Sequence, residues 1–500
     1  MMNRVLKNAA LIGVLFVVLV GVKAGFARSG GDSLGELERF IEVRHLLSEL
    51  YVTDVDAEAA ASAAIEGMID SLNDPYTNYL SPDDLKQFNE SVDGSFVGIG
   101  AEVDLFKDRL RIVAPLEDSP AWNSGVQPGD IVLKIGDEDT LGMSLQDAIK
   151  RLKGVKGTDV TITVRHRSGE EAEITITRDL IKVRSVRGVR RVAEQRFDYM
   201  LDPANKVGYI RLTQFGNRTD AELAEAIEEL KGLGMKGLIL DVRFNGGGLL
   251  SQAQSIGDML LPAGQTIVST KGRKVAESVL KSDNPPLVPT SMPIVLLANE
   301  NSASASEILA GALKDNQRAL IVGTRTFGKG SVQQLRPLGR DRGAIKLTTA
   351  YYYIPSGEKI HKVDGAERWG VDPSEGAYVP MTPKAIREML TLRRDEPTIR
   401  PYDDTTVTPD FLRETIKDPQ LAAALEAVIG KLDGGDWPQV GRSDVDLLVK
   451  AKQRQDLERR LELLEETRQE VEEQLSELLA ENKAAATAPA TQATQPAGGE

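Results

Sequence analysis

Apolar residues recur at helical spacing over the first part of the 500-residue chain. Between residues 35 and 90 they stand three and four positions apart, with the clearest run at Phe40, Val43, Leu46, Leu47 and Leu50. Residues 94–180 instead carry short β runs at 97–103, 110–113, 131–135, 160–165 and 172–177, with one helical run at 144–152. We therefore predict an N-terminal helical segment followed by a small α+β module.

Strand and helix patterns alternate from residue 207 onward. Apolar runs predict strands at 207–212, 238–242, 294–298, 319–323 and 345–353, and helical patterns cover 220–231 and 307–314. This alternation predicts an α/β core with mainly parallel strands. Residues 376–417 are rich in proline and are predicted to be irregular.

The C-terminal part has coiled-coil patterning. Apolar residues follow alternating four- and three-residue steps, with Arg468 at the one missing position of this seam: Leu457, Leu461, Leu464, Val471, Leu475 and Leu478. A single amphipathic helix lying on the core is the alternative. Residues 484–500 consist largely of Ala, Thr, Gln and Pro and are predicted to be disordered.

The N-terminus has the pattern of an export signal. Arg4 and Lys7 precede an apolar run at 9–22, which is short for a membrane-spanning helix, and small residues follow at Gly25-Phe26-Ala27. We expect a signal peptide or an uncleaved membrane anchor over residues 1–27, and export of the remainder. A buried core helix is the weaker alternative.

Composition narrows the function further. The chain is 41% hydrophobic and 27% charged, as soluble globular proteins are, and its net charge of −14 argues against a nucleic-acid surface. It has no cysteine, which excludes disulfides, thiolate nucleophiles and cysteine metal sites. Its three histidines, His45, His166 and His361, are far apart, so we expect no metal and no cofactor.

A serine and a lysine are the main candidates for chemistry. Ser304 lies between an apolar strand pattern and a helical one, where backbone N–H groups are unpaired and can bind an oxyanion. Lacking a plausible histidine, Ser304 needs another base, and burial can lower the pKa of a lysine enough for this role. Lys329 is flanked by Gly328 and Gly330, and one helix and one strand separate it from Ser304. A surface turn is the alternative for Lys329.

Two glycine-rich stretches are candidate backbone-binding sites. Gly246, Gly247 and Gly248 follow a buried strand, which suits outward-facing amides of an oxyanion hole, although a flexible turn fits as well. Gly98-Ile99-Gly100 opens the small module and could hold a peptide carboxylate. Residues 323–330 nearly match a P-loop, but Gly330 stands where that motif needs Ser or Thr.

Together these residues resemble the carboxyl-terminal processing peptidases, a bacterial and chloroplast family of serine–lysine proteases. The resemblance runs from Phe40 to about Gly376. It rests on motifs found in the family's order: Tyr76-Thr77-Asn78-Tyr79-Leu80, Val97-Gly98-Ile99-Gly100, Ser119-Pro120-Ala121, Gly125-Val126-Gln127-Pro128-Gly129-Asp130, Val207-Gly208-Tyr209-Ile210, Asp241-Val242-Arg243, the Ser302–Glu307 stretch and Phe327-Gly328-Lys329-Gly330.

The resemblance implies a role for each matching residue. Ser304 would be the nucleophile, Lys329 the general base and Gln333 the residue that orients it, while the amides of Gly247 and Ala305 would form the oxyanion hole. The tail carboxylate of a substrate would bind at Val97, Gly98, Ile99 and Gly100. Two positions depart from the family pattern, Gly246 in place of Pro and Asn301 in place of Gly.

The implied fold is an α/β protease core similar to the crotonase and ClpP folds, with an inserted PDZ domain. The domains expected are a signal or anchor at 1–27, a helical segment at 28–93, the PDZ domain at 94–180, the protease core at 181–376, an irregular and helical extension at 377–440, an amphipathic coiled-coil-like helix at 441–483 and a disordered tail at 484–500.

The function implied is that of an exported serine endopeptidase, in the bacterial periplasm or anchored to the inner membrane, that cleaves proteins near their C-termini. Its partners would be substrate tails, an adaptor or activator protein and further copies of itself. A catalytically silent or latent PDZ scaffold is the rival reading, and a nucleotide-binding protein is a more distant one. Intact Ser304, Lys329 and Gln333 favour the enzyme.

Overall fold

The computed structural model describes residues 33–443, except 117, 118, 194, 195, 364, 365, 367, 396, 397 and 402–405, together with 454, 457–472, 475 and 476. The predicted signal or anchor at 1–27 and the predicted tail at 484–500 lie outside these residues. Within the described residues, no helix is both long and apolar enough to cross a membrane. The chain divides into two compact units, one ending at Tyr79 and the other beginning at Leu80.

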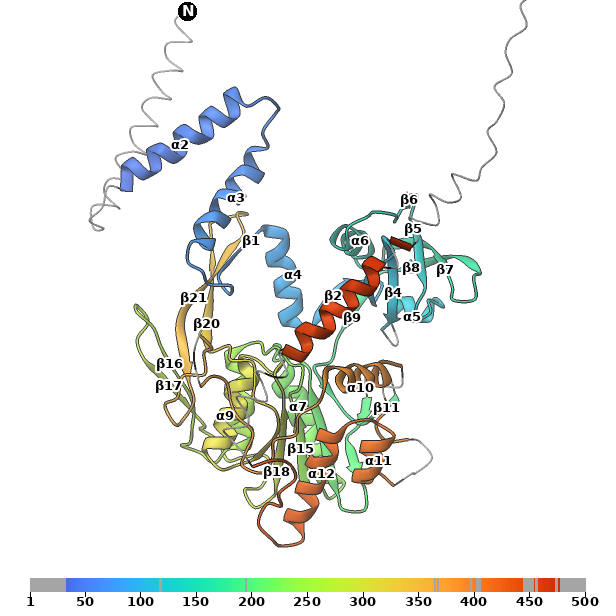
Figure 1. Cartoon of the computed structure of the whole chain (residues 1–500), viewed down its shortest axis with the longest axis vertical. Helices are drawn as coiled ribbons and strands as arrows, with labels where there is room; N and C mark the ends of the chain where they lie inside the picture. The colour runs from blue at the N-terminus through green and yellow to red at the C-terminus, as the bar shows by residue number, and fades with distance from the viewer. Residues whose placement is uncertain are drawn as a thin grey trace, which may run out of the picture. The chain divides into compact units, whose positions relative to one another are not determined.

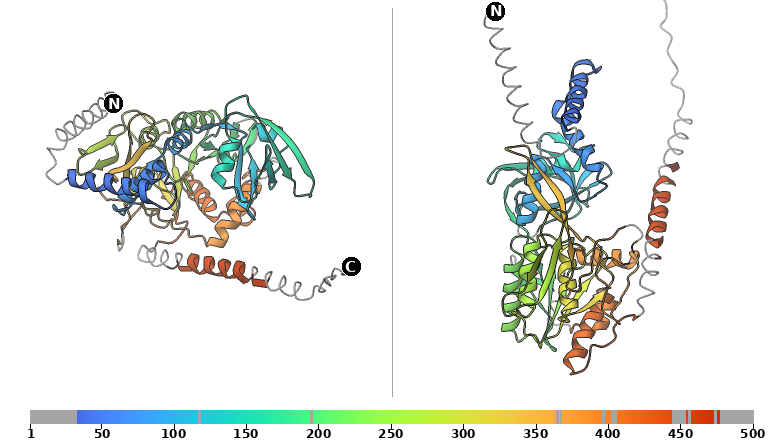
Figure 2. Two further views of the ribbon diagram at one scale, coloured as in Figure 1. Left: turned by 90° about the horizontal axis from the view of Figure 1, so that it is seen from above. Right: turned by 90° about the vertical axis from the view of Figure 1, so that its left-hand side faces the viewer.

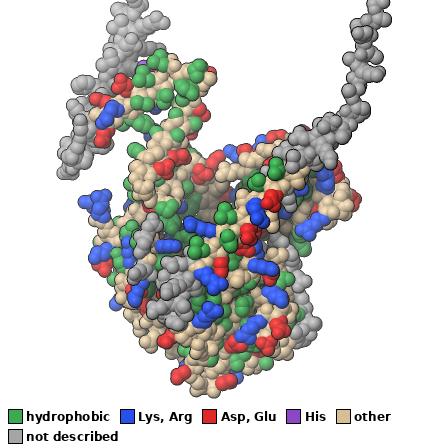
Figure 3. All heavy atoms as spheres, viewed as in Figure 1, with side chains coloured by type: hydrophobic (Ala, Val, Ile, Leu, Met, Phe, Trp, Pro, Cys, Tyr) green, Lys and Arg blue, Asp and Glu red, His purple; other side chains and the backbone are tan. Residues whose placement is uncertain are grey.

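The first unit is helical, as its spacing predicts. It contains α2 (Ser33–Leu50) and α3 (Ala57–Asp70), and β1 (Asn78–Leu80) lies at the unit boundary. Asp56 caps α3 by accepting hydrogen bonds from two backbone N–H groups. Apolar side chains gather on the surface of this unit (Figure 3), and those of α2 include Phe40, Ile41 and Leu50, which are 48%, 57% and 75% exposed.

The small module is built on an antiparallel sheet in the order β3-β4-β5-β7-β8, with β6 paired to β5 and a separate β2–β9 pair. The helix α4 (Pro82–Asp93) precedes it along the chain. Its elements are β2 (Ser95–Gly98), β3 (Ala101–Phe106), β4 (Arg109–Pro115), α5 (Pro120–Asn123), β5 (Ile131–Ile135), β6 (Glu138–Asp139), α6 (Leu145–Leu152), β7 (Asp159–Arg165), β8 (Glu171–Thr177) and β9 (Asp179–Lys182).

The single strand predicted at 97–103 is wrong, because it is divided into β2 and β3. Gly100 has a φ of 77°, and a Cβ at this position would lie 2.3 Å from the Cβ of Ser119. The chain therefore turns at Ile99 and Gly100 in a way that only glycine allows.

The core sheet has four parallel strands in the order β14 (Val207–Leu212), β15 (Gly237–Asp241), β18 (Ile294–Ala298) and β19 (Leu320–Gly323). Short antiparallel strands, β10 (Val186–Arg187) and β13 (Met200–Asp202), pair with β14. The predicted parallel core is thus confirmed. A further pair, β11 (Arg190–Ala193) with β12 (Arg196–Asp198), is separate.

Helices cover both faces of this sheet (Figures 1 and 2). Leu238 and Leu240 pack with α7 (Thr219–Gly232), α8 (Leu250–Leu260) and α9 (Ala305–Asp315), whereas Ile239 packs with α12 (Pro419–Leu432). Both faces of a parallel sheet are buried in this way, which explains the continuous apolar runs of its strands. A second sheet of antiparallel strands contains β16 (Thr266–Lys271), β17 (Ser278–Lys281), β20 (Ser331–Pro337) and β21 (Ala344–Tyr353).

The prediction of an irregular 376–417 segment is wrong, since α10 (Pro383–Asp395) and α11 (Pro409–Glu414) lie there. Pro383, Pro409 and Pro419 each stand at the first residue of a helix. Proline is favoured at that position because its missing N–H would have no partner there. The prolines therefore begin helices rather than interrupt them.

The seam of the C-terminal segment is exposed. Its described residues are helical, and Leu457, Leu461 and Leu464 are 60–68% exposed. The contact with α10 is polar, through ion pairs of Arg387 with Glu462 and Glu466. The alternative of an amphipathic helix that buries its apolar face on the core is therefore wrong for the described residues. The coiled coil stays a prediction. Leu478 lies outside the described residues.

Candidate active site

Ser304 lies at the N-cap of α9 in a strained backbone conformation. Its φ is 56° and its ψ is −114°, values that are rare for any residue with a Cβ, and it is 6% exposed. The serines on either side have structural partners. Ser302 Oγ donates to the carbonyl of Val242 at 2.8 Å, and Ser306 Oγ donates to that of Asn245 at 2.9 Å. Ser304 is thus distinct from its neighbours in conformation, as backbone strain at functional sites often is.

The carboxylate of Glu307 joins the Ser304 and Lys329 segments. Its Oε2 accepts hydrogen bonds from the backbone N–H of Ser304 at 2.9 Å and of Lys329 at 2.8 Å. Its Oε1 accepts from the Gly328 N–H and the Thr326 hydroxyl, each at 2.6 Å. No role for Glu307 was predicted from the sequence, although its position three residues after the N-cap serine is a capping-box signal.

Burial raises the pKa of Glu307, while the four hydrogen bonds to its carboxylate act in the opposite direction. A fully buried carboxylate is costly unless its oxygens are satisfied, and here each oxygen accepts two hydrogen bonds. Glu307 therefore holds two chain segments, separated by α9 and β19, in one fixed geometry.

Lys329 is half-buried between two glycines in close contact with other segments. A Cβ at Gly328 would lie 2.7 Å from the ring of Trp369, and one at Gly330 would lie 2.5 Å from the backbone nitrogen of His361. The glycines thus permit a close approach that larger residues would prevent. Gln333 lies on β20, where its Nε2 donates to Ser331 Oγ at 2.8 Å and to Thr348 Oγ1 at 3.2 Å.

Tyr352 is a further residue of the site that the sequence did not indicate. Its hydroxyl shares a hydrogen bond with Ser304, and its backbone N–H donates to the Gly330 carbonyl at 2.7 Å. Burial raises the pKa of Tyr352 to about 12, so its hydroxyl stays protonated at neutral pH. A tyrosine inside a β run of three tyrosines carries no sequence signal for such a role.

Gly247 lies against the segment that carries Ser304. Its φ is 98°, and a Cβ there would lie 2.6 Å from the Ala303 carbonyl oxygen and 2.8 Å from Ser304 Cβ. Its N–H donates to Asn245 Oδ1 at 2.9 Å, whereas the N–H of Ala305 makes no hydrogen bond to another described residue. The structure therefore brings both predicted oxyanion donors to Ser304, with the Gly247 amide already engaged.

The two departures from the family pattern differ in their effect. Asn301 is not among the described residues with positive φ, so replacing glycine at this position causes no strain. A Cβ at Gly246 would have no atom within 4 Å, so this position is open.

We expect Gly247→Ala to lower kcat/KM by about 100-fold or more, because the new methyl group would overlap the Ala303 carbonyl oxygen and the Ser304 Cβ, and the left-handed φ is strained. Steady-state cleavage of a protein substrate measures the effect. Gly246→Ala is the matched control, since its methyl group enters open space. Equal activity of both variants would show that Gly247 does not shape the site.

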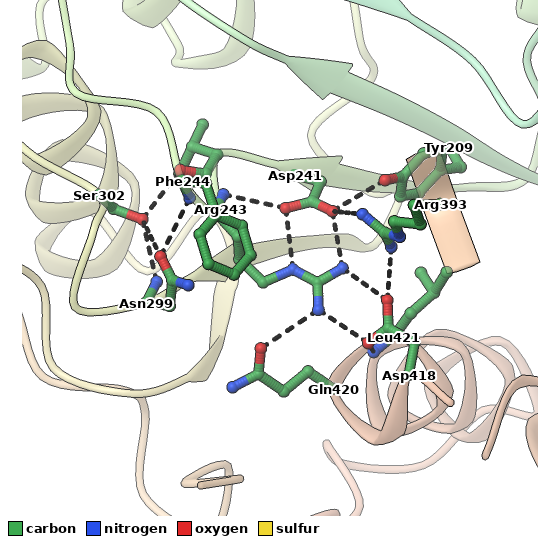
Figure 4. A network of polar contacts seen from close by, with 11 residues as sticks. Tyr209, Asp241, Arg243, Phe244, Asn299, Ser302, Arg393, Asp418, Gln420 and Leu421 are labelled. Carbon is green, nitrogen blue, oxygen red and sulfur yellow. Dashed lines mark hydrogen bonds and ion pairs between the residues drawn. The ribbon is translucent and has the colours of Figure 1, made fainter. Parts of the chain in front are cut away.

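A buried charge cluster supports the loop that carries these glycines (Figure 4). Arg243 donates to both oxygens of Asp241, at 3.0 and 2.7 Å, and to both oxygens of Asp418, at 2.8 and 2.9 Å. Arg393 from α10 pairs with Asp418, and Tyr209 donates to Asp241 at 2.8 Å. Burial acts to raise the pKa of Asp241 and of Asp418, but the arginine charges prevail and hold both below the usual range.

Three of the four predicted carboxylate-binding residues line a groove of the small module, and Val97 does not. The cavity has a volume of about 440 Å³ and includes Gly98, Ile99 and Gly100 from the β2–β3 turn, together with residues of β3, α6 and α4. Val97 lies on β2, and its carbonyl accepts from the Gly154 N–H at 3.4 Å.

The sequence matches three family descriptions: Peptidase family S41 at residues 206–374, PDZ domain at 111–166 and Activating protease CtpB N-terminal domain at 23–83. It is 37% identical over 366 residues to the Carboxy-terminal-processing protease of Bartonella bacilliformis, covering 72% of this chain and 79% of that protein. It is 34% identical over 361 residues to the Probable CtpA-like serine protease of Staphylococcus aureus, covering 72% of this chain and 69% of that protein.

Among solved structures, the Photosystem II D1 C-terminal processing protease matches with 29% identity and a TM-score of 0.40, over 68% of this chain and 86% of that one. The matches to family S41 and to the PDZ domain define a serine-type peptidase with a PDZ domain. More narrowly, the chain belongs to the family of carboxy-terminal-processing proteases.

Proposed function

We propose that this peptidase cleaves exported proteins near their C-termini through a dyad of Ser304 and Lys329. Neutral Lys329 accepts the proton of the Ser304 hydroxyl as the oxygen attacks the scissile carbonyl, and that proton then passes to the leaving amine. Water hydrolyses the acyl-enzyme with Lys329 again as base. The observation that carries this proposal is the Glu307 carboxylate, one oxygen of which accepts N–H groups from both segments.

The supporting residues complete the proposed mechanism. Gln333 orients Lys329, and the amides of Gly247 and Ala305 bind the oxyanion. Because the Gly247 N–H donates to Asn245 in this structure, substrate binding must redirect or share that hydrogen bond. This geometry supports an enzyme whose oxyanion hole is completed only when a substrate is present, and it leaves a latent scaffold as the second candidate function.

We also propose the type of fold of the protease core and the export of the protein. The layered α/β core supports a fold of the crotonase and ClpP type. The basic residues and apolar run at 4–22 support export to the periplasm, as a soluble or anchored enzyme. Isolating the protein from a periplasmic fraction and sequencing its N-terminus would test both the compartment and cleavage near Ala27.

Assembly through the C-terminal helix, with further copies or an adaptor protein, is supported by its exposed seam at Leu457, Leu461 and Leu464. Such a seam becomes buried when a second helix packs against it. Deleting residues 445–500 should lower the mass measured by light scattering. An unchanged mass together with unchanged adaptor-dependent activity would contradict this role.

We expect cleavage to depend on a free C-terminal tail. A fluorogenic protein ending in an unstructured apolar tail should be cleaved several-fold faster than the same protein with an amidated C-terminus, because the PDZ domain binds terminal carboxylates. Equal rates for both substrates would contradict tail recognition. Tail binding without any cleavage would favour the scaffold.

A further inference from the structure

The groove of the PDZ domain has an open strand edge and an apolar lining. β3 is the terminal strand of its sheet, so one of its edges is available to an extended peptide. Apolar side chains from β2, the turn and α6 line the cavity, among them Phe96, Ile99, Ile149 and Leu152. This chemistry suits a substrate tail that ends in apolar residues.

The turn beside this groove presents a backbone donor. The carbonyls of Ile99 and Gly100 are bonded within the domain, to the N–H of Ala121 at 2.8 Å and of Leu116 at 2.8 Å. In a trans peptide the C=O and the following N–H point in opposite directions. The N–H of Gly100 therefore points away from Ala121, and it makes no hydrogen bond to another described residue.

Lys153 places a cation at the same turn. It follows directly after α6, and its Cγ would lie 3.5 Å from a Cβ built at Gly98. Its ammonium stands 5.1 Å from the ring centre of Phe96. A positive charge beside a turn that carries a backbone donor suits the binding of a carboxylate.

The ammonium of Lys153 is already paired with a carboxylate from the chain itself. Glu90 of α4 pairs with Lys153 through its Oε2 at 2.7 Å, and both side chains are largely covered, with 22% and 27% exposed. Glu90 also lines the groove cavity. A second α4–α6 pair, Asp83 with Lys150, has side chains 70% and 74% exposed, and neither residue lines the groove.

We propose that Lys153 binds the terminal carboxylate of the substrate tail, and that Glu90 occupies Lys153 until a tail displaces it. The proposal rests on the proposed function, since it names the charge that recognises the tail of that same substrate. It gives Glu90 a role in the groove, where Glu90 is the carboxylate that lines the cavity beside Lys153. The exchange replaces one carboxylate by another and leaves the charge of the site unchanged.

The experiment is a binding cycle with the full chain carrying Ser304→Ala, so that no peptide is cleaved. The probe is a fluorescein-labelled decapeptide ending in Val-Ala-Val, with either a free carboxylate or an amide, measured by fluorescence anisotropy. Lys153→Met should weaken binding of the acid about 10-fold and of the amide less than 2-fold. A coupling near 10-fold corresponds to about 1.4 kcal/mol. Equal weakening of both peptides, or of neither, would overturn the role of Lys153.

Glu90→Gln should tighten binding of the acid peptide about 5-fold, because it removes the competing carboxylate. Asp83→Asn is the matched control, since it removes the other α4–α6 ion pair, and it should leave affinity unchanged. Weaker or unchanged binding by Glu90→Gln would overturn the displacement. Cleavage by the unmodified enzyme is measured in parallel. If the enzyme cleaves but Lys153→Met weakens the acid and amide peptides equally, this inference alone is refuted. If Lys153→Met weakens mainly the acid peptide but the enzyme does not cleave, the proposed function alone is refuted.

Discussion

Ser304→Ala and Lys329→Ala should each lower kcat/KM by on the order of 10⁴-fold or more, and the double variant should be no worse than either single one. Residues that act as one unit lose their whole effect when either is removed. In the proposed mechanism Ser304 would supply the attacking oxygen, and Lys329 would supply the base without which a serine hydroxyl is a poor nucleophile. Cleavage of a tailed fluorogenic protein measures the loss.

Two exposed residues of the second sheet and its connecting loops serve as controls. Ser278→Ala removes a serine hydroxyl on β17, and Lys359→Ala removes a lysine whose ammonium stands 3.7 Å from the ring centre of Tyr351. Both variants should retain full activity. If either control loses activity as Ser304→Ala does, or if Lys329→Ala keeps it, the dyad is refuted.

The pH dependence separates the candidate bases. kcat/KM should rise with pH as Lys329 loses its proton, because only the neutral amine can accept the serine proton. Tyr352 also contacts Ser304, but its pKa of about 12 keeps it protonated over the range from pH 6 to 10. A flat profile over that range would argue against a lysine base.

Much of the core could be predicted because its strands are buried on both faces. The run at 294–298 is apolar throughout, and the run at 207–212 is apolar apart from Gly208 and Arg211. The observed strands β14 and β18 have these bounds. The strands β16 and β17 were missed, since they belong to an antiparallel sheet with partly exposed residues and carry polar positions. The helices α10 and α11 were missed because their prolines were read as breaks in the pattern.

In the candidate site, likewise, residues within a local motif could be predicted, whereas residues whose role depends on contacts between distant segments could not. Ser304 and Lys329 stand in short motifs whose residue types indicate their chemistry. Glu307 was readable only as a helix cap, because its contact with the Lys329 segment depends on the return of the chain after β19. Asp418 lies 175 positions from Arg243, and no local pattern relates the two. Spatial contact between distant polar residues is what the sequence alone could not supply.

Asp418→Asn should destabilise the core by about 3–5 kcal/mol, because it removes one carboxylate from a buried cluster and leaves an uncompensated charge. In the unmodified chain two aspartates, Asp241 and Asp418, balance Arg243 and Arg393. Thermal unfolding followed by circular dichroism measures the change. Asp56→Asn is the matched control, since it makes the same change at an exposed helix N-cap, where asparagine is as good as aspartate.

The charge cluster should also make the stability of the fold fall at low pH. The pKa values of Asp241 and Asp418 lie below the usual range in the folded chain, so their contribution is present above the unfolded pKa of about 4 and is lost as the pH falls through the folded values. The difference in stability between the unmodified chain and Asp418→Asn should therefore persist from neutral pH to about pH 4 and shrink below it.

Because Arg243 lies in the loop that carries Gly247, the activity of Asp418→Asn should fall at temperatures where the variant is still folded. A variant with unchanged stability and activity would show that Asp418, at the N-cap of α12, does not support the loop that carries Gly247.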